Sequence, residues 1–391
     1  MIEMNEATWR WVEAHRADDV RLLALRDAPP GVDKAQALQQ IAGWQVARTK
    51  LLRWAATAGI LFPPHLALEQ CSSQATAAVK AELAAGDTLV DLTGGLGVDF
   101  AALAPRFKRA VYVERQHHLC ELARHNFPLL GLSHASVVEG AAEDYLARME
   151  TVDWIFLDPA RRDEGGGRVY DMAACEPSVP RLLDVLLARG RRVMVKLSPM
   201  YDWHRAADQL RHVETVMLVG TAGECKELLL VLRAGHEGAP ALCCVSDGER
   251  FTPPAAEVPP APLWDGEAGT GVLHLYEPNA TVMKASCFDA LAAAFGLEAV
   301  GRNSHLFVSR RYEPGFPGRK FVVSAITTMN KKELRATLAG VTRANVAVRN
   351  FPLKAPELAR RLHLKDGGDV YIFATRLEAP ARPLLLLCRK A

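Results

Sequence analysis

The chain has 391 residues, of which 49% are hydrophobic and 24% are charged, and its formal net charge is +2. This length is sufficient for two or three domains with sizeable cores, and the composition is that of an ordinary globular protein, which excludes a disordered chain. So small a net charge excludes nucleic-acid binding driven by the charge of the whole molecule, and any such surface must come from local clusters of basic residues.

Two features predict a soluble cytoplasmic protein that has no membrane segment. Glu3, Glu6 and Glu13 interrupt the N-terminal apolar residues, unlike a secretory signal, and the longest C-terminal apolar run, residues 384–388, is too short to cross a bilayer. The eight cysteines include no C-x-x-C pair. We therefore expect mostly buried, reduced thiols and no metal site.

The N-terminal residues 1–75 are expected to form a helical region. Apolar residues recur at helical spacing over residues 35–57, and Gly59 with the pair Pro63-Pro64 ends that pattern. An alanine-rich helix is predicted over residues 73–85, with Gly86 as its C-cap.

Residues 76–237 alternate between strand and helix patterns. Helical patterns separate the first five apolar strands, which predicts a parallel sheet with right-handed crossovers. The last two strands are separated only by residues 220–227, so we expect an antiparallel pair. The seven strands are predicted at residues 89–92, 110–113, 136–138, 154–157, 192–195, 213–219 and 228–232.

The remaining third of the chain divides into two parts. Residues 236–269 are rich in proline, alanine and glycine, and are expected to form a linker or surface excursion. Residues 270–391 mix short strands with helices and predict a compact α+β region. Its strands are expected at residues 321–326, 346–349, 370–374 and 384–388, and its helices near 280–295, 331–339 and 355–363.

Residues 90–99, Val-Asp-Leu-Thr-Gly-Gly-Leu-Gly-Val-Asp, join the first of the seven strands to a helix through a glycine turn. The dinucleotide-binding pattern G-x-G-x-x-G fails here, because Phe100 stands where its third glycine would be. The motif resembles that of class I S-adenosylmethionine-dependent methyltransferases. The resemblance implies a Rossmann-like α/β fold with a seven-stranded, mostly parallel sheet, and S-adenosylmethionine as the cofactor. It also implies that the cofactor is contacted by Asp91, Thr93, Gly94, Gly95 and Gly97.

Acidic residues follow the next two strands. Glu114 closes the second strand, where a carboxylate accepts both ribose hydroxyls of a bound nucleoside; the alternative is an ordinary solvated acid. After the third strand, the resemblance implies that Glu143 or Asp144 accepts a hydrogen bond from the adenine amine, whereas both residues equally suit a helix cap.

A polar segment lies upstream of the glycine turn, at Glu69-Gln70-Cys71-Ser72-Ser73. By the same resemblance, Gln70 and Ser73 are candidate contacts to the methionine end of the cofactor. The alternative is that Ser72 or Ser73 is simply the N-cap of the next helix.

The fourth strand ends in Asp158-Pro159-Ala160-Arg161-Arg162, where open α/β sheets place their reacting groups. Methylation of uridine C5 needs a cysteine nucleophile just after the fifth strand, and Lys196 to Met200 contain none. We therefore expect transfer to nitrogen or oxygen, with Asp158, Pro159 and Lys196 as the catalytic residues. Lys196 either holds a phosphate or the target oxygen, or pairs with Asp158 or Asp202; Arg161 and Arg162 either contact the substrate or pair with nearby acids.

Basic residues cluster near the C-terminus. Between residues 331 and 365 there are nine lysines and arginines but only two acids, and amide side chains lie beside them. This pattern suits phosphate contacts to RNA, with Arg343, Arg349 and Asn350 as candidate substrate-binding residues. The alternative is a solvated basic face without a ligand.

Several further motifs extend the resemblance over nearly the whole chain: Asp-Pro-Ala-Arg-Arg, Lys-Leu-Ser-Pro-Met, Gly-Glu-Cys-Lys-Glu and Asn-Val-Ala-Val-Arg-Asn-Phe-Pro. Together with the glycine motif they resemble the bacterial methyltransferases that carry a THUMP-like domain. The resemblance implies a methyltransferase domain at 76–237, a ferredoxin-like domain at 270–318 and a THUMP-like domain at 319–391. It also implies an RNA substrate, so we expect methylation of a nitrogen of structured RNA, either tRNA or rRNA. The alternatives are a protein that binds the cofactor without transfer, and a methyltransferase that acts on a protein or small molecule.

Overall fold

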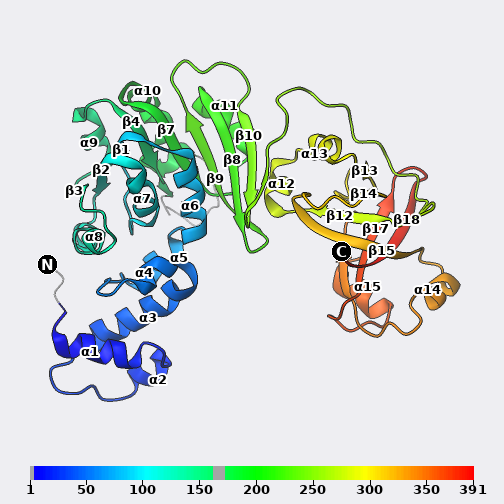
Figure 1. Ribbon diagram of the computed structural model, residues 1–391, viewed down its shortest axis with the longest axis horizontal. Helices are drawn as coiled ribbons and strands as arrows, with labels where there is room; N and C mark the ends of the chain where they lie inside the picture. The colour runs from blue at the N-terminus through cyan, green and yellow to red at the C-terminus, as the bar shows by residue number, and fades with distance from the viewer. Residues whose placement is uncertain (1–3, 162–171) are drawn as a thin grey trace. The chain divides into compact units, whose positions relative to one another are not determined.

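The computed structural model describes residues 4–161 and 172–391, apart from the side chains of 65–67 and 161. It divides into two compact units, each described by itself below. The first comprises Met1–Val219 and Lys226–Pro240, and the second comprises Gly220–Cys225 and Ala241–Ala391. Figure 1 labels their elements.

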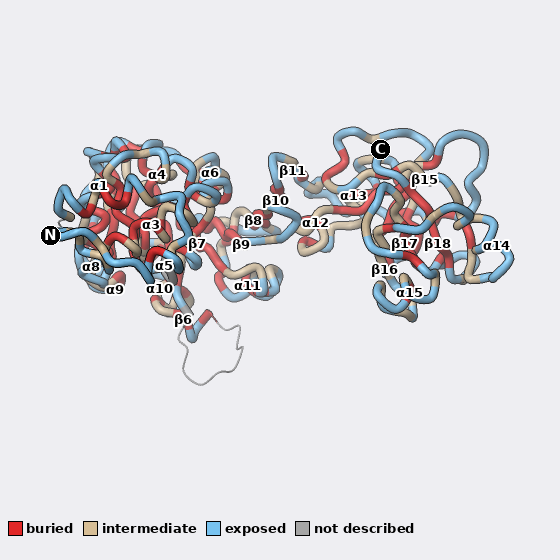
Figure 2. Tube along the Cα trace, turned by 90° about the horizontal axis from the view of Figure 1, so that it is seen from below, coloured by how far each residue is buried: buried red, intermediate tan, exposed pale blue. Residues whose placement is uncertain are grey.

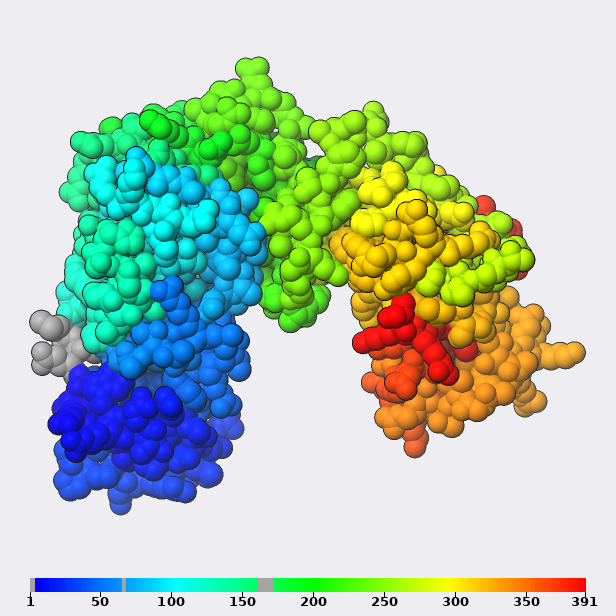
Figure 3. Space-filling model, in the orientation of Figure 1, coloured from blue at the N-terminus to red at the C-terminus, as the bar shows by residue number. Residues whose placement is uncertain are grey.

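The first unit begins with short helices, several of which have side-chain N-caps. Asn5, Asp19, Asp33 and Ser73 each accept a hydrogen bond from a backbone N–H of the following turn. The helices are α1 (Glu6–His15), α2 (Val20–Ala24), α3 (Lys34–Lys50), α4 (Leu52–Ala56), α5 (His65–Gln70) and α6 (Gln74–Leu83). In the space-filling view these segments, in blue, adjoin the part of the first unit drawn in cyan (Figure 3). Trp54 and Ala77 share a hydrophobic core with Phe100, whereas Trp11 and Leu23 belong to a separate cluster.

Two details of the N-terminal prediction are wrong. The single helix expected over residues 35–57 breaks at Leu51, which has φ −135° and ψ 64° and is completely buried. Burial of this side chain in the core therefore outweighs continuation of the helix. Gly86 does not cap α6, because Ala84 holds that position and Gly86 begins the first strand.

The sheet strands that belong to the first unit lie in the order β8-β9-β7-β4-β1-β2-β3. Strands β3, β2, β1, β4 and β7 pair in parallel, and β9 runs antiparallel to β7. The antiparallel strand lies inside the sheet, between β7 and β8. The strands are β1 (Gly86–Asp91), β2 (Phe107–Glu114), β3 (Ala135–Glu139), β4 (Val152–Leu157), β7 (Gly190–Leu197), β8 (Val213–Thr221) and β9 (Glu224–Leu232).

Helices connect the parallel strands, as the alternating pattern predicts. β1, β2, β4 and β7 each end in a run of buried residues, whereas β3, at the edge of the sheet, has none. Figure 2 draws buried residues in red, as in β7. Phe100, Tyr112 and Phe127 form an aromatic cluster beside the glycine turn. The connecting elements are α7 (Val98–Leu103), η1 (Ala104–Arg106), α8 (His117–Leu129), α9 (Ala142–Arg148), η2 (Met172–Ala174), α10 (Val179–Arg189) and α11 (Trp203–Leu210). A separate two-stranded sheet pairs β5 (Ala160–Arg161) with β6 (Cys175–Glu176).

The expected linker over residues 236–269 contains a hairpin of β10 (Ala241–Ser246) and β11 (Glu249–Phe251) in the second unit. Its turn is the pair Asp247-Gly248, and both residues have positive φ, at 48° and 86°. This Asp-Gly pair is a strong hairpin signal after the apolar run 242–245. Trp264 is also only 1% exposed, so the linker prediction is wrong for this segment.

The second unit contains a seven-stranded sheet with the order β13-β14-β12-β15-β18-β17-β16. Alternate residues of β18 belong to two different hydrophobic clusters, so both faces of the sheet are covered. The strands are β12 (His274–Pro278), β13 (Glu298–Ala299), β14 (Phe307–Ser309), β15 (Gly318–Thr327), β16 (Asn345–Val348), β17 (Tyr371–Leu377) and β18 (Arg382–Lys390); the helices are α12 (Ala280–Ala285), α13 (Phe288–Phe295), α14 (Lys331–Thr337) and α15 (Ala355–Arg361).

Candidate active site

A cavity of about 540 Å³ opens at the carboxyl ends of the parallel strands in the first unit. Its walls come from the segments that follow β1, β2, β3 and β4, and from Lys196 near the end of β7. Open α/β sheets bind ligands at this edge, and the volume is that of a small-molecule site.

The glycine turn forms one wall and depends on glycine at two positions. Gly97 has φ +83°, a left-handed conformation, and it precedes α7. A Cβ on Gly94 would lie 2.2 Å from Cε2 of Tyr112, whose hydroxyl donates to the carbonyl of Gly95. The turn is therefore packed directly on the aromatic cluster, and its backbone faces the cavity.

Glu114 is fixed at the end of β2. The backbone N–H groups of Gly95 and Gln116 donate to its two carboxylate oxygens, each at 2.8 Å. The side chain lines the cavity although the residue is only 7% exposed. Each oxygen keeps a further lone pair, so the carboxylate fits a ligand that presents two neighbouring hydroxyl groups.

Asp91 adds a second acceptor to the same wall. Its Oδ1 accepts from the backbone N–H of Thr93 at 2.9 Å, whereas its buried Oδ2 has no hydrogen-bond partner in the described part of the chain. Burial raises the pKa of Asp91 well above its ordinary value. A buried acceptor without a donor indicates a place for a polar ligand group.

The remaining residues expected to contact the cofactor separate into two groups. Gln70 and Glu143 line the cavity, but Ser73 and Asp144 do not. Ser73 is the N-cap of α6, where its hydroxyl accepts from the backbone N–H of Thr76 at 3.1 Å. The structure thus gives Ser73 the capping role that was its alternative.

The expected catalytic residues lie close together at the ends of β4 and β7. Lys196 Nζ lies 2.5 Å from Asp158 Oδ2, so the ion pair is formed, and both residues line the cavity. Pro159 is buried and does not line it. Burial raises the pKa of Asp158, although Lys196 opposes this effect; Asp158 and Asp99 raise the pKa of Lys196 despite its burial.

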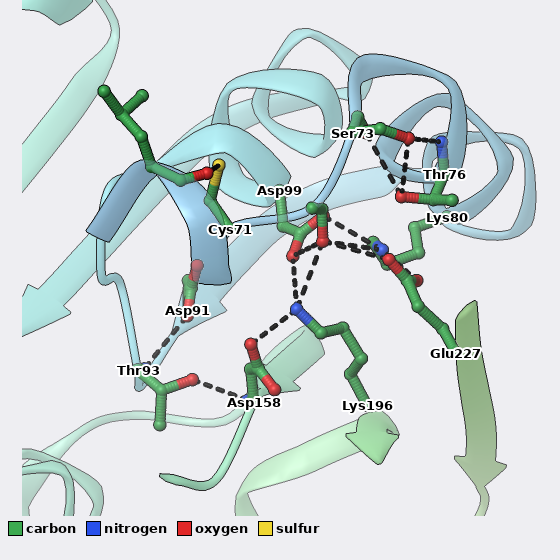
Figure 4. Close-up of polar contacts among 12 residues, drawn as sticks. Cys71, Ser73, Thr76, Lys80, Asp91, Thr93, Asp99, Asp158, Lys196 and Glu227 are labelled. Carbon is green, nitrogen blue, oxygen red and sulfur yellow. Dashed lines mark hydrogen bonds and ion pairs between the residues drawn. The ribbon is translucent and has the colours of Figure 1, made fainter. Parts of the chain in front are cut away.

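Four residues that the sequence interpretation did not assign to the site lie next to this ion pair: Ser72, Lys80, Asp99 and Glu227. Figure 4 shows Lys80, Asp99 and Glu227 on the side of Lys196 away from the Asp91 turn. Burial alone would raise the pKa of Asp99, but Lys80 and Lys196 outweigh it and lower the value to about 2. Asp99, Lys196 and Glu227 belong to motifs read from the sequence, whereas Lys80 lies in an alanine-rich helix that gives no signal.

Cys71 also lines the cavity, which bears on covalent chemistry. Its thiol donates to the carbonyl of Leu68 at 3.2 Å, and burial raises its pKa. The reactive form of cysteine is the thiolate, so a raised pKa makes Cys71 a poor nucleophile.

Three of the residues expected to bind substrate, Arg343, Arg349 and Asn350, lie outside the cavity lining. Arg343 and Arg349 belong to the second unit, where Arg343 donates to the carbonyl of Asp366 at 2.8 Å and Arg349 pairs with buried Glu277 at 2.5 Å. Asn350 has φ 53° and is exposed. The side chain of Arg161 and the whole of Arg162 lie outside the described residues.

The described residues show neither of two other classes of site. They contain no group of three or more histidine, cysteine or acidic side chains arranged to hold a metal ion. No helix among them is long and apolar enough to cross a membrane.

Comparisons with known proteins agree with this geometry. A family model described as a ferredoxin-like domain matches residues 274–317, and one described as THUMP domain-like matches residues 318–390. The crystal structure of a candidate methyltransferase from Porphyromonas gingivalis W83 has 33% sequence identity and a TM-score of 0.84, with 100% of both chains covered. Uncharacterized S-adenosylmethionine-dependent methyltransferases from Mycobacterium tuberculosis strains CDC 1551 and H37Rv are 27% identical over 325 residues, which are 80% of this chain and 84% of theirs.

The sheet order and the cavity at its carboxyl edge define a class I methyltransferase domain. The chain belongs to the bacterial family of class I S-adenosylmethionine-dependent methyltransferases with C-terminal ferredoxin-like and THUMP-like domains. The family and the fold class expected from the sequence are confirmed, whereas the domain limits and the roles of single residues stay predictions.

Proposed function

We propose that this protein transfers the methyl group of S-adenosylmethionine to a nitrogen of structured RNA, either tRNA or rRNA, without a covalent cysteine intermediate. The observation that carries the proposal is the single cavity in which Glu114, fixed by two backbone donors, and Asp158 both take part. Family membership supports the class of reaction.

The residues of the cavity fit the cofactor. When bound, S-adenosylmethionine supplies an electrophilic methyl group on its sulfonium. Glu114 would accept from the two ribose hydroxyls, and Asp91 Oδ2 would accept from a polar group of the ligand. Gln70 and Glu143 are available for the remaining polar groups, since both line the cavity.

On the acceptor side, the protein's task is to position a nitrogen and to accept its proton. Asp158 is suited to both, because its side chain is 40% exposed and lines the same cavity. Cys71 is unsuited to a covalent step because of its raised pKa, which favours direct transfer.

The second unit supports RNA as the partner. Of the nine basic residues between 331 and 365, all but the half-buried Arg349 are exposed. Only Glu333 and Glu357 oppose them in this stretch. Exposed lysine and arginine side chains contact phosphates in a sequence-independent way. The C-terminal domain resembles THUMP domains, which are RNA-binding modules, and this resemblance also favours RNA.

Binding of S-adenosylmethionine, measured by calorimetry, tests the first step. Glu114→Ala removes an acceptor of two charge-assisted hydrogen bonds, each worth about 1.5–3 kcal/mol, so we expect the affinity to fall by at least roughly tenfold. Glu257→Ala changes an exposed acid of the second unit and serves as the control. Unchanged affinity in Glu114→Ala would refute the assignment of this cavity.

A methyl-transfer assay tests whether RNA is the methyl acceptor. It uses labelled cofactor and total RNA from a strain that lacks the gene for this protein. Label in RNA supports the proposal. Label only in protein or small molecules would instead identify another substrate, and binding without any transfer would leave a cofactor-binding protein.

A further inference from the structure

Motifs that lie far apart in the sequence meet in one buried cluster. Ser72 comes from Glu-Gln-Cys-Ser-Ser, Asp99 ends the glycine motif, Lys196 begins Lys-Leu-Ser-Pro-Met and Glu227 ends Gly-Glu-Cys-Lys-Glu. Figure 4 shows Asp99, Lys196 and Glu227 converging with Lys80 of α6. We call Ser72, Lys80, Asp99, Glu227 and Lys196 the buried ionic cluster.

The ammonium group of Lys196 is saturated by the protein. Its Nζ lies 2.5 Å from Asp158 Oδ2 and donates to Ser72 Oγ at 3.1 Å and to Asp99 Oδ2 at 3.2 Å. Lysine has three N–H donors, and three oxygens surround this one. Lys196 therefore has no donor left for a phosphate or for an oxygen of the methyl acceptor.

Lys80 is saturated in the same way, and Ser72 links the two lysines. Lys80 Nζ pairs with Glu227 Oε2, lies 3.0 Å from Asp99 Oδ1 and donates to Ser72 Oγ at 3.2 Å. The hydroxyl of Ser72 accepts from both lysines, and its one hydrogen is shared between Asp99 Oδ2 at 2.8 Å and Glu227 Oε1 at 3.0 Å. Both lysines and Ser72 thus find their partners within the cluster or at Asp158, which stabilises buried charges. Asp99 Oδ1 lies 3.0 Å from Lys80 Nζ in an ion pair but accepts no hydrogen bond among the described residues.

The charges do not cancel once Asp158 is included. Two ammonium groups, of Lys80 and Lys196, face three carboxylates, of Asp99, Glu227 and Asp158, which leaves one negative charge. The first four side chains are between 0% and 11% exposed, whereas that of Asp158 is 40% exposed. Of the five charged side chains, that of Asp158 is therefore the one most exposed to the cavity.

One oxygen of Asp158 has no hydrogen-bond donor among the described residues and can accept from a ligand. Oδ2 is held by Lys196, but Oδ1 receives no hydrogen bond from the part of the chain that the structure describes. The backbone N–H of Asp158 donates to Thr93 Oγ1 at 2.6 Å, which ties the residue to the glycine turn. The carboxylate is thereby held in place from two sides.

We propose that the buried ionic cluster is a positioning device: it withholds Lys196 from ligands and presents Asp158 Oδ1 as a hydrogen-bond acceptor. The site consequently takes a methyl acceptor that brings an N–H group to Asp158 and rejects oxyanions such as phosphate. This inference rests on the proposed function and defines the chemistry of its acceptor more narrowly.

Two cofactor analogues test the inference without any transfer reaction. S-adenosylhomocysteine lacks the methyl group, whereas sinefungin carries an amine in its place and so brings N–H donors and a positive charge. We expect sinefungin to bind at least about tenfold more tightly, the effect of a charge-assisted hydrogen bond. Asp158→Asn should abolish this preference, and Asp184→Asn, which changes an exposed acid of α10 outside the cavity lining, should leave it unchanged.

A charge-balanced pair of variants separates positioning from a merely structural role. Glu227→Gln removes the excess negative charge, so the preference for sinefungin should fall. The double variant Glu227→Gln with Lys80→Met restores the original net charge and should restore the preference. A merely structural role would lower the unfolding temperature in both variants and leave the affinity ratio unmoved.

The outcomes distinguish this inference from the proposed function. If neither analogue binds, the cofactor assignment itself is wrong. If both bind with equal affinity, or if Asp158→Asn keeps the preference, the positioning role is refuted while cofactor binding stands. Competition of inorganic phosphate with S-adenosylhomocysteine at constant ionic strength would equally refute it, because Lys196 would then be available to an anion.

Discussion

Replacement of Gly94 by alanine tests the packing that holds the glycine turn. The new Cβ would lie 2.2–2.6 Å from three atoms of the Tyr112 ring, so the ring would have to withdraw by about 1 Å to reach ordinary contact. The ring packs on Phe100 and Phe127, and its hydroxyl donates to Gly95. Overpacking costs about 1–3 kcal/mol and a lost hydrogen bond about 1 kcal/mol, so we expect a destabilisation of about 2–4 kcal/mol.

Thermal unfolding measures this effect. About 2–4 °C per kcal/mol is usual for 150–250 residues, so Gly94→Ala should lower the unfolding temperature by roughly 5–15 °C. Gly95→Ala is the matched control: Gly95 has φ +55°, but its Cβ would meet nothing closer than 3.7 Å, so only a backbone cost of about 1 kcal/mol is expected. Adding Tyr112→Val should relieve the clash at Gly94→Ala in a double-mutant cycle. An unfolding temperature unchanged in Gly94→Ala, or no coupling with Tyr112→Val, would refute the reasoning.

Three further predictions concern the cavity and the basic surface. Cys71→Ser should keep most methyl transfer, because the thiol is not the nucleophile; complete loss in a folded variant would contradict this. The pKa of Asp99 is lowered to about 2. Its ion pairs therefore stabilise the fold fully at a pH above about 4, the ordinary pKa of aspartate, and lose this effect as the pH falls toward 2. In denaturant unfolding, the difference in the free energy of unfolding between wild type and Asp99→Asn should shrink by on the order of 2 kcal/mol from pH 5 to pH 2. A difference that does not change with pH would exclude this linkage. Arg360→Ala with Arg361→Ala should weaken RNA binding and reduce the salt dependence of log K by about 1 per lost phosphate contact, and an unchanged slope would place RNA elsewhere.

The order of strands and helices in the first unit follows from the sequence, because a strict alternation of apolar strands and helical patterns permits few topologies. The last two of the seven strands, expected to form a pair, are neighbours in the sheet as β8 and β9. β9 also runs antiparallel to β7, which the sequence did not predict. The hairpin β10–β11 was missed because prolines on either side of residues 241–251 dominate the composition there, although Asp247-Gly248 is a recognisable turn signal.

The buried ionic cluster could not be predicted in the same way. Lys80 and Glu227 are 147 residues apart and become partners only when α6 and β9 pack in the first unit. A lysine in an alanine-rich helix predicts an exposed side chain, yet Lys80 is completely buried. The role of Lys80 thus depends on tertiary packing. The role of Glu114, in contrast, could be proposed from its position at the end of the second strand.

Transfer of a labelled methyl group from S-adenosylmethionine to RNA is the measurement that tests the central claim most directly. The wild-type protein should label structured RNA from a deletion strain, and both Glu114→Ala and Asp158→Asn should reduce that labelling strongly while Glu257→Ala does not. RNA that stays unlabelled in the presence of bound cofactor, whether the label enters another molecule or none, would contradict the account.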